Sequence, residues 1–302
     1  DFFVEGASSV AKMLKVPSLI IGMTIVAMGT SLPETSVSIA ASMNNQNTLA
    51  VSNVVGSNIF NLMVVLGICA VISKLQVSRD VLKRDYPFSV LCAILLLVCG
   101  CIGMELGRID GIVFLVIFVG FIVVLIKSAM DARKRGEISE KEREMNEEMS
   151  EMKEQPVWKS IIYIVGGAIA IKYGGDWVVD SASTIATSFG ISATLVGLTI
   201  CSVGTSLPEL VTSIVAARKN ELDMAVGNVV GSNVFNILMV LGVAATISPI
   251  TFLMENVIDI IVLLVFSLIT WVFCMTKKEI GKKEGIIMLV LYAIYLVYIC
   301  LR

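Results

Sequence analysis

Two identical hexapeptides place oxygen-bearing side chains inside strongly apolar sequence. The motif GTSLPE occupies residues 29–34 and again residues 204–209. In a helix, Glu34 lies four residues after Thr30 and shares its face, and Ser31 adds a second hydroxyl on the same turn. The proline of each copy cannot donate a backbone hydrogen bond, so it frees the carbonyl of the glycine that begins the motif. Each copy thus offers a carboxylate, hydroxyls and bare carbonyls, all of which are oxygen ligands.

A second repeated motif adds small polar groups. NVVGSN occupies residues 53–58 and 228–233, and an asparagine follows each copy three residues later. The serine of the motif and this asparagine are four residues apart, so they share one helix face. The glycine of each copy allows close approach of a neighbouring helix. The side chains predicted from this motif either bind an ion or form hydrogen bonds between helices; they are Ser57, Asn61, Ser232 and Asn236.

The composition indicates that helices crossing a membrane must position these residues. Hydrophobic residues make up 56% of the 302-residue chain and charged residues 16%, with a mean hydropathy of +0.88. Such values are atypical of soluble domains, and the apolar runs approach the roughly 20 residues of a spanning helix. We predict an all-α membrane protein with a polar segment at 131–157. The predicted spans are 17–40, 47–73, 87–107, 109–130, 159–182, 193–217, 223–248, 256–275 and 284–301.

The ligand types predict a site for a hard cation. Calcium takes six to eight oxygen ligands at flexible distances, and the two glutamates, Glu34 and Glu209, together neutralise one Ca²⁺. The same oxygens could hold sodium. Two bare carboxylates are costly inside a bilayer, so an empty site is disfavoured and we expect exchange of cations rather than one-way transport. The chain has no histidine, and its seven cysteines lack metal-ligand spacing, which argues against a transition-metal site.

The two halves of the chain repeat each other. A shift of 175 residues superimposes the first 73 residues on the second half without a gap, and it pairs Glu34 with Glu209 and Asn61 with Asn236. Agreement of this length indicates internal duplication. An apolar run precedes the second repeat only, so we expect the first repeat to lack most of its first helix. The predicted architecture is ten helices in two five-helix repeats, with units at 1–130 and 158–302 and a linker at 131–157.

An odd number of helices per repeat predicts that the two repeats are inverted in the membrane. Lysines and arginines gather in alternate connectors, which by the positive-inside rule face the cytoplasm. We therefore predict a multi-pass protein of the cell membrane with residues 131–157 in the cytoplasm and both termini outside. Inverted repeats with interrupted helices are typical of secondary transporters, whose site lies where the repeats meet.

GTSLPE followed about twenty residues later by GNVVGSN, once in each half, resembles the paired alpha-repeats of the sodium/calcium exchangers in the cation/Ca²⁺ antiporter superfamily. The resemblance covers nearly the whole chain. It implies Na⁺/Ca²⁺ antiport by alternating access, in which the helices that begin each half slide against the others. It also implies a set of ion ligands. These are Glu34 and Glu209 as the main ligands, the hydroxyls of Thr30, Ser31, Thr205, Ser206, Ser57 and Ser232, and backbone carbonyls near Ala27 and Ser202.

One position separates this chain from some relatives of the family it resembles. Many microbial and potassium-dependent relatives carry an aspartate where this chain has Asn236. We therefore expect no potassium requirement, and we expect Asn61 and Asn236 to contribute amide oxygens. The site would then hold two carboxylates rather than three.

Other functions remain open at this stage. An H⁺/Ca²⁺ antiporter could use the same fold, with Glu34 and Glu209 taking up protons. A cation channel fits less well, because channels commonly use pore loops or charged rings with rotational symmetry. We do not expect an enzyme, because no nucleophile and base are paired in the sequence. We expect Ca²⁺ and Na⁺ as substrates, the lipid bilayer as surroundings, a monomer, no cofactor and no nucleic acid.

Overall fold

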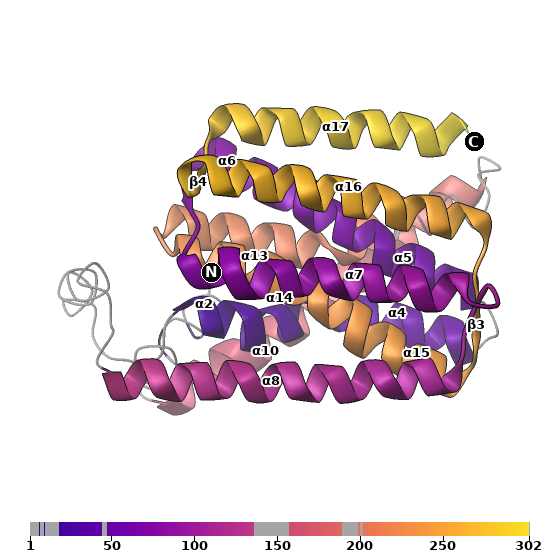
Figure 1. Ribbon diagram of the computed structural model, residues 1–302, viewed down its shortest axis with the longest axis horizontal. Helices are drawn as coiled ribbons and strands as arrows, with labels where there is room; N and C mark the ends of the chain where they lie inside the picture. The colour runs from indigo at the N-terminus through magenta and orange to yellow at the C-terminus, as the bar shows by residue number, and fades with distance from the viewer. Residues whose placement is uncertain are drawn as a thin grey trace.

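The computed structural model describes residues 18–43, 47–135, 157–188 and 202–301, together with Gly6, Ser9 and Thr199. The described chain is mostly helical, and most of its helices lie along one common direction (Figure 1). The predicted linker falls largely outside the described residues, because α8 ends at Arg135 and the next described helix begins at Val157.

The helices of the first half follow one another along the bundle, with short π-helical turns between some of them. They are α2 (Ser18–Ile21), a π turn (Gly22–Val26), α3 (Ala27–Thr30), α4 (Leu32–Met43), α5 (Asn47–Phe60), a π turn (Asn61–Val65), α6 (Leu66–Ile72), β1 (Leu75–Gln76), a π turn (Val81–Asp85), α7 (Tyr86–Cys101), β2 (Glu105–Leu106) and α8 (Arg108–Arg135).

The elements of the second half are α10 (Val157–Ser188), α12 (Ser202–Thr205), α13 (Leu207–Arg218), α14 (Leu222–Phe235), a π turn (Asn236–Val240), α15 (Leu241–Ile247), β3 (Ile250–Thr251), α16 (Met254–Lys277), β4 (Glu279–Ile280) and α17 (Lys282–Leu301). From α12 onward, the second half repeats the order of helices that begins with α3 in the first half, and the long helix α10 precedes them.

Both GTSLPE motifs interrupt a helix, as the sequence predicts. In the first half the break falls at Ser31, whose φ and ψ are −84° and 14°, between α3 and α4. In the second half it falls at Ser206, at −88° and 4°. Each proline then lies in the first turn of the following helix, where a backbone N–H would have no acceptor within that helix. The interruption is therefore built into the sequence of each repeat.

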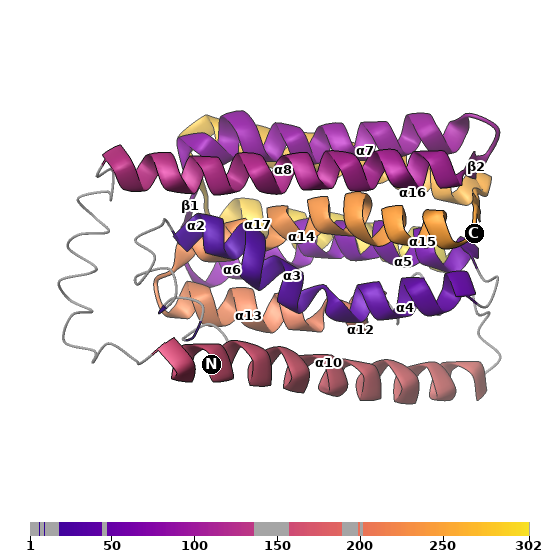
Figure 2. The same cartoon turned by 90° about the horizontal axis from the view of Figure 1, so that it is seen from below.

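Contacts between the halves come in equivalent pairs, as a two-fold relation between inverted repeats requires. Strand β1 pairs antiparallel with β4, and β2 pairs antiparallel with β3. The two small sheets lie at opposite ends of the bundle (Figures 1 and 2). Helix α17 packs on α6, and the equivalent helix α8 packs on α15.

Close glycine contacts repeat in the same way. A Cβ atom on Gly67 of α6 would lie 3.2 Å from the carbonyl oxygen of Gly285, and one on Gly242 of α15 would lie 3.2 Å from that of Gly111. Both helix pairs thus approach closely enough for backbone contact, which small residues permit in membrane proteins. The inverted repeat predicted from the sequence is visible in these matched pairs.

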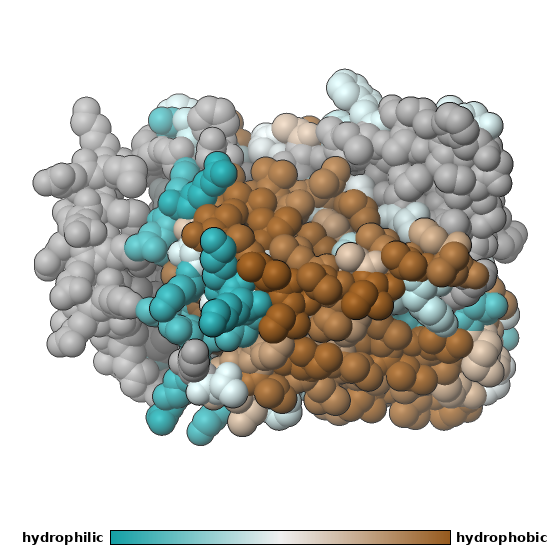
Figure 3. Space-filling model, turned by 90° about the horizontal axis from the view of Figure 1, so that it is seen from above, coloured by the Kyte–Doolittle hydropathy of each residue, from teal (hydrophilic) through white to brown (hydrophobic). Residues whose placement is uncertain are grey.

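The outward surface of the bundle is apolar. Within the described residues, six helices are long and apolar enough to cross a membrane: Thr48–Ile72, Val81–Cys101, Arg108–Ser128, Leu222–Ile247, Met254–Thr276 and Lys282–Leu301. Large apolar side chains point outward from them, with Val116 66% and Ile294 60% exposed. Figure 3 shows a hydrophobic face with hydrophilic residues at the end where α17 begins. This distribution suits a bilayer around the middle of the bundle.

The predicted spans agree with the helices except at some ends. The predicted span 87–107 extends too far, because α7 ends at Cys101 and the chain then turns into β2. The turn includes Gly103 and Met104, both with positive φ. Most of the predicted span 193–217 that precedes α12 lies outside the described residues.

Candidate cation site

The two GTSLPE motifs meet at the centre of the bundle, and each glutamate is held by the opposite motif. Glu34 and Glu209 are both fully buried. The Ser206 hydroxyl donates to Oε1 of Glu34 at 3.0 Å, and the Ser31 hydroxyl donates to Oε1 of Glu209 at 2.8 Å. The contact is therefore reciprocal, and it brings together two carboxylates that are 175 residues apart in sequence.

One oxygen of each carboxylate has no partner. Among the described residues, Oε2 of Glu34 and Oε2 of Glu209 are buried without a hydrogen bond. An unpaired buried charge is strongly unfavourable, whereas a buried charge that contacts a cation is stabilised. The two free oxygens are thus available as ligands for a cation at this position.

Hydroxyls and backbone carbonyls surround the carboxylates. On one side, the Thr30 hydroxyl lies 3.3 Å from the Ala27 carbonyl oxygen and 3.2 Å from Oδ1 of Asn228. On the equivalent side, the Thr205 hydroxyl lies 3.4 Å from the Ser202 carbonyl oxygen and 3.4 Å from Oδ1 of Asn53. The two sides carry the same groups because they are the same sequence positions in the two repeats.

The serines of the NVVGSN motif join the cluster in two different ways. The Ser232 hydroxyl donates to Oε1 of Glu209 at 3.4 Å. The Ser57 hydroxyl instead lies 3.4 Å from the Ser202 carbonyl oxygen and 3.3 Å from the Thr205 hydroxyl. The two halves of the site are therefore similar but not identical in this conformation.

Asn61 and Asn236 are fully buried at the point where α5 and α14 each pass into a π turn. Such turns are frequent at functional sites. Asn236 donates through Nδ2 to Oδ1 of Asn58 at 3.1 Å, and its own Oδ1 has no partner among the residues that the structure describes. Within the described residues, neither polar atom of the Asn61 side chain has a partner. Both residues therefore offer an unused amide oxygen.

Four asparagines of the repeated motif also reach this cluster, although the sequence did not predict them: Asn53, Asn58, Asn228 and Asn233. Asn53 and Asn228 contact the threonines of the opposite repeat, and Asn228 also donates to the Ser213 hydroxyl at 3.0 Å. A signal for them was present, because Asn53 precedes Ser57 by four residues and so shares its helix face. The other two bind crosswise through backbone groups: Asn58 Nδ2 lies 3.1 Å from the Asn233 carbonyl oxygen, and Asn233 Nδ2 lies 3.3 Å from the Asn58 carbonyl oxygen.

The candidate ligands as a whole are neutral oxygens around two carboxylates. Within the part of the chain that the structure describes, no three histidine, cysteine, aspartate or glutamate side chains gather as a metal cluster. Hydroxyl, amide and carbonyl oxygens with few carboxylates suit hard cations rather than transition metals.

Comparison with known proteins gives consistent matches over the whole chain. The sequence model of the family described as sodium/calcium exchanger protein matches residues 1–127 and 159–301. The chain is 36% identical to the inner membrane protein YrbG of Escherichia coli (strain K12), over 95% of this chain and 88% of that protein. It is 32% identical to the sodium/calcium exchanger MaX1 of Methanosarcina acetivorans, over 98% and 93%.

A solved structure of the sodium-calcium exchanger NCX_Mj matches with a TM-score of 0.81 and 32% identity, covering 98% of this chain and 92% of that one. This match confirms the fold class expected from the sequence, an all-α inverted-repeat membrane protein.

Proposed function

The chain belongs to the sodium/calcium exchanger protein family, and we propose that it exchanges Na⁺ for Ca²⁺ at the site between Glu34 and Glu209. It is a multi-pass membrane protein of the antiporter type and not an enzyme. The observation that carries the proposal is the reciprocal pair of buried glutamates. Each has one oxygen that accepts a hydrogen bond from the opposite repeat and one that has no partner in the described part of the chain.

Calcium binds the free carboxylate oxygens, and neutral oxygens complete its shell. Two carboxylates balance the charge of one Ca²⁺, and the hydroxyls and carbonyls satisfy its need for six to eight ligands. Sodium ions bind at the same oxygens in place of calcium. The proposed ligands are Glu34, Glu209, Thr30, Ser31, Thr205, Ser206, Ser57, Ser232, Asn61 and Asn236, with the carbonyls of Ala27 and Ser202.

The buried charges explain why one cation replaces another. With no ion bound, two carboxylates would face each other in a site from which water is largely excluded, and this state is strongly disfavoured. A conformational change is therefore favourable only with cations bound. Coupling follows from electrostatics and needs no additional regulatory element.

Helix α10 is the element best placed to switch access. It contacts α3 and α4 of the first motif and α12 and α13 of the second, and Figure 2 shows it at the edge of the bundle, beside the helices that carry the site. Sliding of α10 opens the site to one side of the membrane at a time. The five-helix units comprise residues 1–130 and 158–302, and the linker at 131–157 lies in the cytoplasm.

The proposal is tested by calcium uptake into proteoliposomes that contain the full chain. Vesicles loaded with Na⁺ should take up radioactive calcium when diluted into sodium-free buffer, and vesicles with only a pH gradient should not. Added external K⁺ should leave the uptake unchanged. Uptake driven by the pH gradient alone would identify protons rather than sodium as the counter-ion. Uptake that needs no counter-cation would refute exchange.

A further inference from the structure

A basic groove lies at one end of the bundle, away from the cation site. It has a volume of about 570 Å³ and lies between the start of the α7 segment and the end of α16. Seven residues line it: Arg79, Leu82, Lys83, Pro87, Trp271, Met275 and Lys278. We propose that this groove binds the headgroup and upper acyl chain of an anionic phospholipid.

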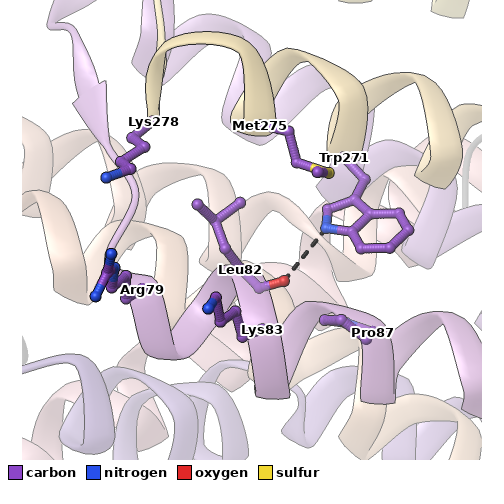
Figure 4. Close-up of a pocket in the computed structure, with 7 residues that line it drawn as sticks. All are labelled: Arg79, Leu82, Lys83, Pro87, Trp271, Met275 and Lys278. Atoms are coloured by element: carbon purple, nitrogen blue, oxygen red, sulfur yellow. Dashed lines mark hydrogen bonds between the residues drawn. The ribbon is translucent and has the colours of Figure 1, made fainter.

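The groove is divided into a charged part and an apolar part. In Figure 4 the nitrogens of Arg79, Lys83 and Lys278 lie on one side, and Trp271, Met275 and Pro87 lie on the other. The charged part is at the helix ends. Lys278 directly follows the end of α16 at Lys277, and Arg79 lies two residues before the span Val81–Cys101. A phospholipid has the same division, with its phosphate at the water boundary and its chains toward the hydrocarbon.

The tryptophan fixes the boundary between these two parts. Trp271 donates through Nε1 to the Leu82 carbonyl oxygen at 3.3 Å, so its ring is held in the wall of the groove. Tryptophan is enriched at the membrane–water interface, where its ring sits at the level of the headgroups. The groove therefore lies at the depth of a lipid headgroup and opens on the apolar outer face.

The cations that line the groove differ from two neighbouring basic residues in having no ion pair among the described residues. At this end of the bundle Lys74 pairs with Glu279 at 3.6 Å and Arg84 pairs with Asp85 at 2.7 Å. No ion pair joins Arg79, Lys83 or Lys278 to another described residue, and no acidic residue lines the groove. Basic pockets between spanning helices are typical sites for anionic headgroups.

The internal symmetry supplies a comparison within the same molecule. Lys278 precedes β4 with φ 56°, and Met104 precedes β2 with φ 51°. The carbonyl oxygen of each accepts one backbone hydrogen bond. The donor to Lys278 is the N–H of Val77 and the donor to Met104 is the N–H of Phe252, both at 2.9 Å. Met104 is thus the equivalent of Lys278 at the other end of the bundle.

The other two cations are also absent from the equivalent positions. The shift of 175 residues that relates β1 to β3 places Met254 at the position of Arg79 and Ile258 at the position of Lys83. All three cations are therefore replaced by apolar residues at the opposite end. The two-fold fold does not require these charges. The positive-inside rule accounts for basic residues at this end in general, whereas the gathering of three cations around one groove, with no ion pair to another described residue, points to an anionic ligand there.

The test is native mass spectrometry of the detergent-solubilised full chain titrated with phosphatidylglycerol or phosphatidylcholine. We expect preferential binding of phosphatidylglycerol. The triple variant Arg79→Gln, Lys83→Gln, Lys278→Gln should lose affinity by roughly a hundredfold, because each basic residue contributes to attraction of an anionic headgroup. The matched control, Lys219→Gln, Lys282→Gln, Lys283→Gln, removes the same charge outside the groove and should bind as the parent does. Equal melting temperatures in phosphatidylcholine micelles would establish that both variants are folded.

Three results would overturn the proposal. The first is an equal loss of lipid affinity in the control variant, which would indicate diffuse electrostatic attraction. The second is retained lipid binding in the groove variant. The third is displacement of the lipid by inorganic phosphate at equal concentration, which would identify the ligand as a soluble anion. The experiment does not use ion transport, so its failure would leave the proposed exchange untouched.

Discussion

At the scale of single residues, Ser31 and Ser206 connect the two halves of the proposed ion site. Each donates a hydrogen bond to the glutamate of the opposite repeat, at 2.8 Å and 3.0 Å. These bonds orient the carboxylates so that the remaining oxygen of each faces away from its serine. We therefore expect the serines to affect ion affinity through the position of the glutamates as well as through their own oxygens.

Replacing either serine by alanine should weaken calcium binding without unfolding the protein. A buried hydrogen bond to a charged group contributes about 1.5–3 kcal/mol, so we expect a loss of affinity of roughly 10- to 100-fold in a calcium titration of Ser31→Ala or Ser206→Ala. Ser36→Ala is the matched control, because the Ser36 hydroxyl, on the helix that follows Ser31, donates to the Leu32 carbonyl oxygen of that same helix. A similar loss in the control would exclude a specific role for the two serines.

A substitution at Asn61 distinguishes a role in stability from a role in ion binding. Its side chain is buried, and neither of its polar atoms has a partner among the described residues. Such a group destabilises the fold by about 1–3 kcal/mol unless an ion or water satisfies it. Asn61→Leu should therefore raise the melting temperature of the ion-free protein and lower its affinity for Ca²⁺ or Na⁺. Unchanged affinity would remove Asn61 from the ligand set.

At the scale of elements, the site depends on how closely its helices approach. A Cβ atom on Gly231 of α14 would lie 2.7 Å from Cα of Met23 and 2.8 Å from its carbonyl oxygen. Neither backbone atom can move without shifting the segment that leads into the first GTSLPE motif. The glycine of the second motif is thus required by packing.

Gly231→Ala should lower both stability and ion affinity. Overpacking of this kind costs about 1–3 kcal/mol, which thermal unfolding in detergent would detect. Gly120→Ala provides the control, because a Cβ atom at Gly120 meets nothing within 4 Å, and alanine favours a helix by about 1 kcal/mol over glycine. If both variants unfolded at the same temperature, close packing at Gly231 would not be the cause.

The sequence predicted the long helices and their interruption at GTSLPE, but not the finer connections between them. Apolar runs and the proline of GTSLPE determine where helices form and where they break, so these features were predictable. The two-residue strands β1 to β4 were not, because they depend on pairing between distant chain segments. The same applies to the π turns at Asn61 and Asn236, since tertiary contacts decide where a helix widens.

The pairing of each glutamate with the serine of the opposite repeat also could not be predicted from the sequence. The repeat predicts that Glu34 and Glu209 are equivalent, yet equivalence alone does not say which side chain of the other half each one contacts. The difference between Ser57 and Ser232 is a further example. The two motifs are identical in sequence, but in this conformation their serines have different hydrogen-bond partners.

At the scale of the whole molecule, the charge distribution predicts an orientation in the membrane. The basic residues Lys74, Arg79, Lys83, Lys278, Lys282 and Lys283 flank the sheet of β1 and β4, whereas the sheet of β2 and β3 lies at the opposite end. The positive-inside rule therefore places the β1–β4 end in the cytoplasm.

Labelling of introduced cysteines would test this orientation. In a background where the exposed Cys101 and Cys300 are replaced by serine, Glu105→Cys should react with a membrane-impermeant maleimide on intact cells. Lys283→Cys should react only after the membrane is permeabilised. Both positions are exposed, so access alone separates them. The reverse pattern would invert the topology and leave the fold unchanged.

The most direct test of the central proposal is equilibrium calcium binding to the purified full chain, with and without sodium. Parent protein should bind Ca²⁺ and release it as Na⁺ is added, while Glu34→Gln and Glu209→Gln should each abolish binding at the same calcium concentrations. Glu255→Gln, at an exposed carboxylate, should behave as the parent does. Calcium binding that survives either buried substitution, or that is indifferent to sodium, would contradict a shared site formed by the two repeats.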